Sequence, residues 1–401
     1  MSYLHDLGIV CSLGNCKEQV FDSLINRPSK EYLTPWRQAL DSDKVFQCGQ
    51  VKLNANEMPD LTKYPLHFQS RNNQLSLLAY QQIEKTVNQI NADICPSRVA
   101  VVLGTSTSGI KEGEIARAAH KGLGIWPENY HYSIQEMASP AHFIAEIVGA
   151  KGPVYTISTA CSSSSKALAS ARNLLNSNLV DMVICGGVDT LSHLPNNGFN
   201  SLESIANQFC NPLSAERDGI NIGEGAALFV MSKKPANIKL KGVGETSDAY
   251  HISAPHPEGE GAKAAMELAL NNAGLTVDDI HYINLHGTAT IKNDEMETHA
   301  VAEIFGAKVP CSSTKRFTGH TLGAAGGIEA GILWLLLSSL NIEDNIPINK
   351  SDFGIDANFD KIAISQGSLG VSLENALSNS FAFGGNNISI ILGKENEKLR
   401  D

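Results

Sequence analysis

The sequence predicts an α/β protein made of two similar halves, each a parallel sheet covered by helices. In both halves, short apolar and β-branched runs are followed by longer stretches with helical periodicity. Residues 101–107 and 283–290 also share a strand-like run that ends in Gly, Thr, a small residue and Thr. Their glycines, Gly104 and Gly287, lie 183 positions apart (287 minus 104), nearly half of the chain. We therefore expect the two sheets to pack back to back.

The individual elements follow from local patterns along the chain. Strands are expected where β-branched and apolar residues cluster, over residues 101–107, 154–157 and 279–283. Helices are expected where apolar residues recur at helical spacing, over residues 74–89, 166–176, 261–272 and 322–340. The Lys-rich, Gly-containing stretch 233–244 marks the junction, so the expected domains are residues 1–240 and 241–401.

Composition argues against several classes of protein. The chain is 42% hydrophobic and 18% charged, which is enough to bury a core. Its net charge of −11 argues against nucleic-acid binding, which depends on neutralising phosphates. The eight cysteines form no Cys-x-x-Cys pair, and no charged and apolar leader opens the sequence. The apolar stretch 328–340 contains Glu329 and is shorter than the about 20 residues that span a bilayer. We expect a reduced, soluble, cytoplasmic protein without a membrane span.

Cys161 is the strongest candidate for a reactive residue. It stands where the strand-like run 154–157 gives way to small polar residues and then to a helical pattern. The N–H groups and dipole of a helix N-terminus favour a thiolate, and cysteine pKa values there fall from about 8.5 to roughly 3.5–7.5. We therefore expect an acylatable thiol. For the other seven cysteines, a buried small hydrophobe is the better interpretation.

Two histidine motifs extend this candidate site. His286 follows a strand-like run in residues 284–290, and His320 lies within residues 315–327. Both histidines follow turns rich in Gly and Thr, where a side chain can be aimed rather than packed. Most of the twelve histidines are expected to be ordinary surface or core residues. One cysteine and two histidines together therefore point to catalysis.

These three segments, in this order, resemble the β-ketoacyl-acyl carrier protein synthases of type I/II. Further stretches resemble the same family, namely residues 211–213 with 217–219 and 223–226, residues 248–255, and residues 379–387. The resemblance covers nearly the whole chain. It implies a thiolase-like, five-layer αβαβα fold made of two duplicated α/β halves, an acyltransferase activity and no cofactor or metal.

The implied reaction is a decarboxylative Claisen condensation. Cys161 would hold the acyl group as a thioester, because a thiolate both attacks and leaves readily. Malonyl on the carrier protein would lose CO2, and its enolate oxygen would need hydrogen-bond donors. The resemblance makes His286 and His320 those donors, each worth roughly 10²–10³ in rate. Lys315 would tune the protonation of the histidines.

The resemblance also assigns supporting roles. Backbone N–H groups of Cys161 and Phe383 would form the oxyanion hole, and Phe383 would gate the thiol. Thr288 and Thr290 would bind the pantetheine arm, and Thr107 would lie near a neighbour's acyl pocket. Structural supports for the active-site loops would be Asp294, Glu297 and Glu329. Docking of an acidic carrier protein would need basic residues, for which Arg71, Lys111, Arg117, Lys121 and Arg172 are candidates.

Pathway and partner remain open at this point. Residues 70–75, 105–109 and 194–199 are more similar to synthases of aryl polyene clusters than to fatty-acid enzymes, whereas general fatty-acid elongation is the alternative. A homodimer or a heterodimer with a chain-length factor is implied. Two competing functions are a silent chain-length factor, which would lack the nucleophile, and a thiolase or initiation-type synthase acting on coenzyme A esters, which would lack one histidine.

Overall fold

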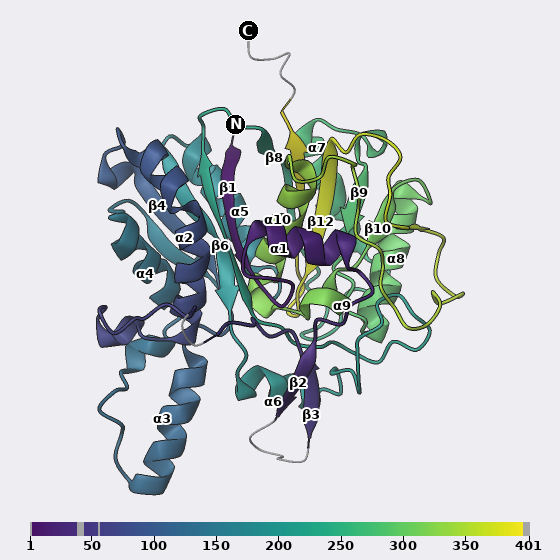
Figure 1. Ribbon diagram of the computed structural model, residues 1–401. Helices are drawn as coiled ribbons and strands as arrows, with labels where there is room; N and C mark the ends of the chain where they lie inside the picture. The colour runs from purple at the N-terminus through teal and green to yellow at the C-terminus, as the bar shows by residue number, and fades with distance from the viewer. Residues whose placement is uncertain (1, 38–43, 55–56, 396–401) are drawn as a thin grey trace.

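The computed structural model describes residues 2–37, 44–54 and 57–395 (Figure 1). Eleven strands form one mixed sheet in the order β11-β10-β9-β12-β13-β8-β1-β7-β6-β4-β5. Their bounds are β1 Tyr3–Val10, β4 Val99–Gly104, β5 Val154–Ile157, β6 Met182–Asp189, β7 Gly225–Ser232, β8 Ile238–Ser247, β9 Tyr282–Asn284, β10 Pro310–Ser312, β11 Ala363–Ile364, β12 Asn375–Phe381 and β13 Asn386–Lys394. Strands β2 (Thr34–Arg37) and β3 (Val45–Cys48) pair separately.

The sheet has two parts, joined where Tyr3 of β1 pairs with Lys239 of β8. The first part runs β5-β4-β6-β7-β1 and the second β10-β9-β12-β13-β8. When the strands of each part are numbered in chain order, leaving out β11, both parts have the same spatial order. The expected all-parallel sheets are wrong. β7 is antiparallel to β6 and β1, and β13 is antiparallel to β12 and β8. A strand buried on both faces has the same apolar pattern in either direction, so its direction is not visible in the sequence.

Helices form three layers around the two parts of the sheet (Figure 1). α5 and α10 lie between the parts, α2 and α4 cover the outer face of the first, and α7, joined by α8, covers that of the second. The bounds are α1 Lys17–Phe21, α2 Arg71–Asn91, α3 Ile110–Leu123, α4 Ser139–Val148, α5 Ser163–Asn176, α6 His193–Ser201, α7 Glu260–Ala273, α8 Ile291–Phe305, α9 Lys315–Thr318 and α10 Ala325–Leu337.

The four expected helices are present with shifted ends. α2 starts earlier than residue 74 because the Ser70 hydroxyl caps it by accepting from the N–H of Asn73. The expected helix 322–340 begins instead as the 3-10 turn Leu322–Ala324 and ends at Leu337. The expected junction 233–244 comprises the turn after β7 and the first part of β8.

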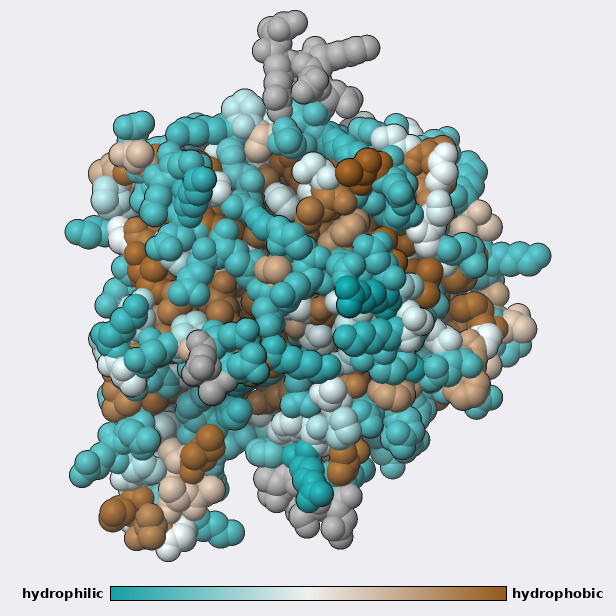
Figure 2. Space-filling model, in the orientation of Figure 1, coloured by the Kyte–Doolittle hydropathy of each residue, from teal (hydrophilic) through white to brown (hydrophobic). Residues whose placement is uncertain are grey.

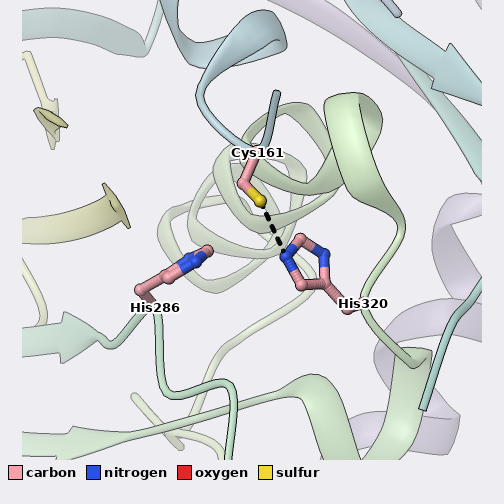
Figure 3. A group of neighbouring side chains, drawn as sticks. All are labelled: Cys161, His286 and His320. Atoms are coloured by element: carbon pink, nitrogen blue, oxygen red, sulfur yellow. Dashed lines mark hydrogen bonds between the residues drawn. The ribbon is translucent and has the colours of Figure 1, made fainter. Parts of the chain in front are cut away.

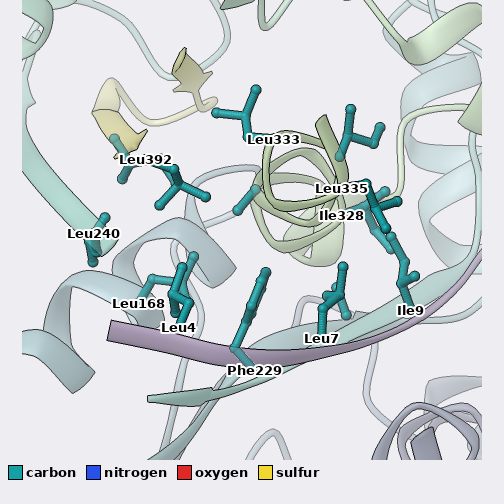
Figure 4. Close-up of a cluster of buried hydrophobic side chains, with 14 of the residues drawn as sticks. Leu4, Leu7, Ile9, Leu168, Phe229, Leu240, Ile328, Leu333, Leu335 and Leu392 are labelled. Carbon is teal, nitrogen blue, oxygen red and sulfur yellow. The ribbon is translucent and has the colours of Figure 1, made fainter. Parts of the chain in front are cut away.

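The central core joins the two parts of the sheet (Figure 4). Leu7 of β1, Phe229 of β7 and Leu168 of α5 pack with Ile328 and Leu333 of α10, all essentially buried. Full burial of such side chains contributes about 1.5–3 kcal/mol each. α10 is apolar nearly all round because protein covers it on nearly every side. In the described parts of the chain, no helix is long and apolar enough to cross a bilayer.

One helix stands apart from these layers. α3 extends from the body of the molecule in Figure 1, and apolar residues gather at its far end in Figure 2. Leu123, Ile125 and Trp126 are 75%, 69% and 53% exposed there. This apolar, exposed surface is typical of a contact with another protein.

Candidate active site

Three loops bring Cys161, His286 and His320 together (Figure 3). Cys161 lies between β5 and α5, His286 follows β9, and His320 lies between α9 and the turn Leu322–Ala324. One thiol or ring-nitrogen atom from each residue lies within 4.8 Å of the others. All three side chains are buried. The structure thus assembles the three residues that the motifs singled out.

Cys161 is held in a tight turn before α5. Ala160 has a φ of +52°, in the left-handed region, and the Sγ of Cys161 lies 3.0 Å from Nε2 of His320. The expected low pKa is wrong for the free protein, because burial raises the pKa of the thiol to about 11. Lys315 and the backbone N–H groups of Phe383 and Cys161 oppose that rise. Desolvation of the sulfur anion is thus a larger effect on this pKa than the helix end.

The histidines are set as hydrogen-bond donors. Nζ of Lys315 lies 3.4 Å from Nδ1 of His286, and the N–H of Leu322 donates to Nδ1 of His320 at 3.1 Å. Because each Nδ1 accepts a hydrogen bond, each Nε2 carries the ring proton. Burial, and then the charge of Lys315, hold the pKa of both histidines well below 6.5. The site therefore presents two neutral Nε2–H donors beside the thiol.

Lys315 and Glu329 form a buried ion pair behind His286. Nζ of Lys315 donates to Oε1 of Glu329 and to the carbonyl oxygen of His286. Burial raises the pKa of Glu329, and Lys315 opposes the rise. Both side chains are at most 3% exposed, so each needs the other as a partner. The pair fixes the ammonium group that faces Nδ1 of His286.

Two buried carboxylates hold the loop of His286. Oε1 of Glu297 accepts the N–H of His286 at 2.8 Å, and Oε2 accepts the N–H of Gly287 at 2.7 Å. Oδ1 of Asp294 accepts the N–H of Ala289 at 3.1 Å. Burial raises the pKa of Glu297 to about 7. Both acids lie on α8, one turn apart, so one helix orders the backbone that carries the histidine.

A cavity of about 280 Å³ reaches the thiol. Thr288, Thr290 and Phe383 line it with the three central residues, and the two threonine hydroxyls lie 2.9 Å apart. Gly384 and Gly385, with φ of +86° and +79°, let the Phe383 loop turn closely over the site.

Some expected residues lie elsewhere. Thr107 lies outside this chain's own cavity, and its buried hydroxyl donates to Asp189 at 2.7 Å. Its expected place near a neighbour's acyl pocket stays a prediction. Arg71 is not free to dock a carrier protein, because its guanidinium pairs with Glu224. Sequence reasoning missed Asp189, although a single acidic residue at the end of a fully apolar strand was a visible signal.

Cys161, His286 and His320 also form the one set in the described residues with the make-up of a metal site. A metal at Nε2 would require each ring proton to move to Nδ1. Those two Nδ1 atoms already face donors, Lys315 and the N–H of Leu322. The hydrogen bonds therefore suit an oxygen acceptor of a substrate rather than a metal ion.

Comparison with known families identifies this combination. The model "Beta-ketoacyl synthase, N-terminal domain" matches residues 48–236, and "Beta-ketoacyl synthase, C-terminal domain" matches residues 238–348. The chain belongs to the β-ketoacyl synthase family. The resemblance seen in the sequence is thereby confirmed, and the mixed sheet and its helices are those of a thiolase-like ketosynthase fold.

Relatives of this synthase are similar over most of their length. The 3-oxoacyl-[acyl-carrier-protein] synthase 2 of Staphylococcus aureus (strain N315) is 31% identical, covering 87% of this chain and 88% of the relative. That of a Synechocystis species is 29% identical, covering 97% and 96%. Among solved structures, a ketosynthase (ApeO) in complex with its chain length factor (ApeC) from Xenorhabdus doucetiae is 41% identical, with a TM-score of 0.91 and 98% of each chain covered.

These relatives establish the activity. The synthase is a β-ketoacyl-acyl carrier protein synthase, an acyltransferase that condenses acyl units bound to acyl carrier protein. The expected reaction class is confirmed. A silent chain-length factor, expected to lack the nucleophile, is disfavoured because Cys161 is present.

Proposed function

We propose that Cys161 carries the acyl chain and that His286 and His320 stabilise the enolate formed from malonyl. The observation that carries this assignment is the convergence of one thiol and two imidazole rings in the lining of one cavity, with the thiol and one nitrogen of each ring within 4.8 Å of one another. A coenzyme A-dependent thiolase or initiation-type synthase is disfavoured, because such relatives lack one of the two histidines and this chain has both.

The first half-reaction is acyl transfer. The sulfur of Cys161 attacks the carbonyl of the acyl-carrier thioester, and the carrier thiol leaves with the proton from Cys161. The tetrahedral oxyanion lies between the N–H groups of Cys161 and Phe383, which already face the sulfur in the free protein. His320 contacts the sulfur and favours its anionic form during the attack.

The second half-reaction is condensation. Malonyl-carrier enters, its bond to the carboxylate breaks, and CO2 leaves with the electron pair remaining on the enolate. The enolate oxygen accepts from Nε2–H of His286 and His320, so no strong base is required. The enolate carbon then attacks the acyl carbonyl, the bond to Cys161 breaks, and the thiolate is regenerated.

The other site residues support these steps. Thr288 and Thr290 line the cavity and are proposed to bind the pantetheine arm, and the ring of Phe383, 5.7 Å from that of Phe199, is proposed as the gate. Asp294, Glu297 and Glu329 hold the loops and Lys315, as their hydrogen bonds indicate. Thr107 is proposed to lie near the acyl pocket of the partner in the dimer.

Intact-mass spectrometry tests the nucleophile. With acyl-carrier protein as donor, Cys161→Ala is expected to gain no acyl mass and to lose condensation. Cys95→Ala, which changes an exposed cysteine, is the matched control and should acylate normally. An acyl adduct that persists on Cys161→Ala, or that maps to Cys185 or Cys311, would contradict the assignment.

We propose that the synthase works as a pair, with a second copy or with a chain-length factor. β5 is the last strand of the sheet, so one of its backbone edges has no strand beside it among the described residues, and its four residues are only partly buried. The exposed apolar end of α3 supports the same conclusion. Obligate interfaces bury about 2,000–5,000 Å², so light scattering should find a dimer when the correct partner is present. A stable, active monomer would contradict it.

We propose aryl polyene elongation, rather than general fatty-acid elongation, as the pathway. The motifs at residues 70–75, 105–109 and 194–199 support it. The 41% identity to a ketosynthase that works with a chain length factor, against 31% for the S. aureus synthase, points the same way. Competition between aryl-enoyl and alkyl groups on the carrier should load the aryl group on Cys161 preferentially. Preferential loading of the alkyl group would favour fatty-acid elongation.

The two halves of the chain share an arrangement of strands. We propose that residues 1–240 and 241–401 descend from one duplicated α/β unit, which the matching strand order and directions support. The interleaved helices then make the five-layer αβαβα arrangement. Eight unpaired cysteines support a reducing compartment, and we propose the cytoplasm.

A further inference from the structure

Asp189, the last residue of β6, is a fully buried carboxylate whose hydrogen-bond partners are all neutral groups. Its Oδ1 accepts from the hydroxyls of Thr105 and Thr107 and from the N–H groups of Ser106 and Thr107, at 2.7–2.9 Å. Its Oδ2 accepts from the N–H groups of Ala324 and Ser106, both at 3.1 Å. Because backbone N–H groups face both oxygens, the site is built for the ionised carboxylate.

The Oδ2 contact reaches across to the loop of His320. Asp189 belongs to the first half of the chain, and Ala324 closes the 3-10 turn Leu322–Ala324 in the second. Gly323 lies so close that an added Cβ would stand 2.8 Å from Oδ2 of Asp189 and 2.7 Å from Oγ of Ser106. The carboxylate therefore fixes both the hydrogen bonding and the position of this turn.

The same turn supplies the donor to His320. The N–H of Leu322 donates to Nδ1 of His320, and Nε2 of that ring faces Cys161. Leu322 has a φ of +52°, a conformation that residues other than glycine rarely adopt. Such a conformation persists where the surroundings hold it, and here Asp189 holds the residue two positions on.

We propose that Asp189 is a positioning residue for the condensation, which acts by holding the turn Leu322–Ala324 so that Nδ1 of His320 stays an acceptor and Nε2 keeps its proton. The proposal rests on the donor role of His320 given above. It adds that a carboxylate outside the cavity sets the tautomer of one catalytic histidine.

Asp189→Asn tests this directly. The amide oxygen would remain with the four donors on the Oδ1 side, which leaves the amide N–H2 against the N–H of Ala324. The turn should then shift and release Nδ1 of His320. In the ¹⁵N spectrum of histidine-labelled protein, His320 should change from one tautomer to a mixture. The kcat of malonyl decarboxylation should fall about tenfold, part of the loss expected for a whole donor, with KM for malonyl-carrier unchanged.

Thr105→Val is the matched control. It removes one hydroxyl from the same carboxylate but leaves the contact with Ala324, so the His320 tautomer and the decarboxylation rate should stay as in the wild type. The His320 signals are assigned by their loss in His320→Gln. A folded Asp189→Asn with unchanged tautomer would overturn the proposal, whether or not its rate falls.

A second variant keeps the test valid if Asp189→Asn does not fold. Ala324→Pro deletes the N–H, which donates both to Asp189 and to the carbonyl oxygen of Thr321, but leaves the carboxylate in place. The φ of Ala324, −79°, suits proline. It should give the same tautomer mixture, and an unchanged tautomer would again overturn the proposal. A tautomer change without loss of decarboxylation would instead contradict the proposed role of His320, so the two failures are distinguishable.

Discussion

The loops of His286 and His320 reach the same protonation state by different means. Nδ1 of His286 faces the ammonium group of Lys315, a side chain held by Glu329, whereas Nδ1 of His320 accepts a backbone N–H from Leu322. The first loop is ordered by acids on the helix that follows it, the second by an acid from the other half of the chain. The tautomer of His286 thus depends on a buried ion pair, and that of His320 depends on the shape of a turn.

Lys315→Met should have the largest effect on stability and activity. It should also show that the tautomers of the two histidines are held independently. It leaves Glu329 buried without its partner, and breaking a buried pair lowers the free energy of unfolding by about 3–5 kcal/mol. Adding Glu329→Gln should recover most of that loss in urea unfolding. Decarboxylation should stay low, because His286 still lacks its donor while His320 keeps its own. A double variant with wild-type decarboxylation would show that the Lys315 contact has no part in catalysis.

His286→Ala and His320→Ala should each lower malonyl decarboxylation by about 10²–10³. They should differ in acyl loading, because only His320 makes a hydrogen-bond contact with the sulfur, at 3.0 Å. Loading should therefore be slower in His320→Ala than in His286→Ala, with some acyl-Cys161 in both. CO2 release and intact mass, followed in parallel, measure the two steps. Complete loss of loading with normal decarboxylation in both variants would reverse the proposed roles.

The pH dependence of labelling sharpens the description of the thiol beside His320. Below a pKa of about 11 the thiolate fraction rises with pH, so iodoacetamide should label Cys161 about tenfold faster per unit from pH 7 to 10. Cys95 is an internal control, because it is exposed and a hydrogen bond with the Ser97 side chain lowers its pKa. Its rate should level off at lower pH. A plateau for Cys161 below pH 8 would restore the low pKa expected from the helix end.

Ala289→Gly should give the smallest effect. Ala289, in the loop of His286, has a φ of +63°, and a left-handed conformation costs an L residue about 1–2 kcal/mol that glycine avoids. The variant should gain up to about 1 kcal/mol in the free energy of unfolding. Ala265→Gly, a buried change within α7, should lose a similar amount and serves as the control. Destabilisation by Ala289→Gly would mean that its backbone is not strained.

Local patterns were sufficient for much of the fold and for the central residues. The strand over residues 154–157 and the helix after it follow from a change in periodicity within a few residues, and both are present. Cys161, His286 and His320 were found because each stands in a short motif with a distinctive neighbourhood. Such signals lie within one segment, so they can be recognised without knowing which other residues that segment contacts in the fold.

Tertiary structure decided what depends on residues far apart in the chain. Contacts between separate segments set the direction of β7 and the burial that raises the pKa of Cys161. They also place the Thr107 hydroxyl against Asp189. The tautomer of His320 depends on a carboxylate 131 positions earlier (320 minus 189). The sequence by itself determined which residues form the candidate site. Their protonation was set by packing, because desolvation and hydrogen bonding act through space and not along the chain.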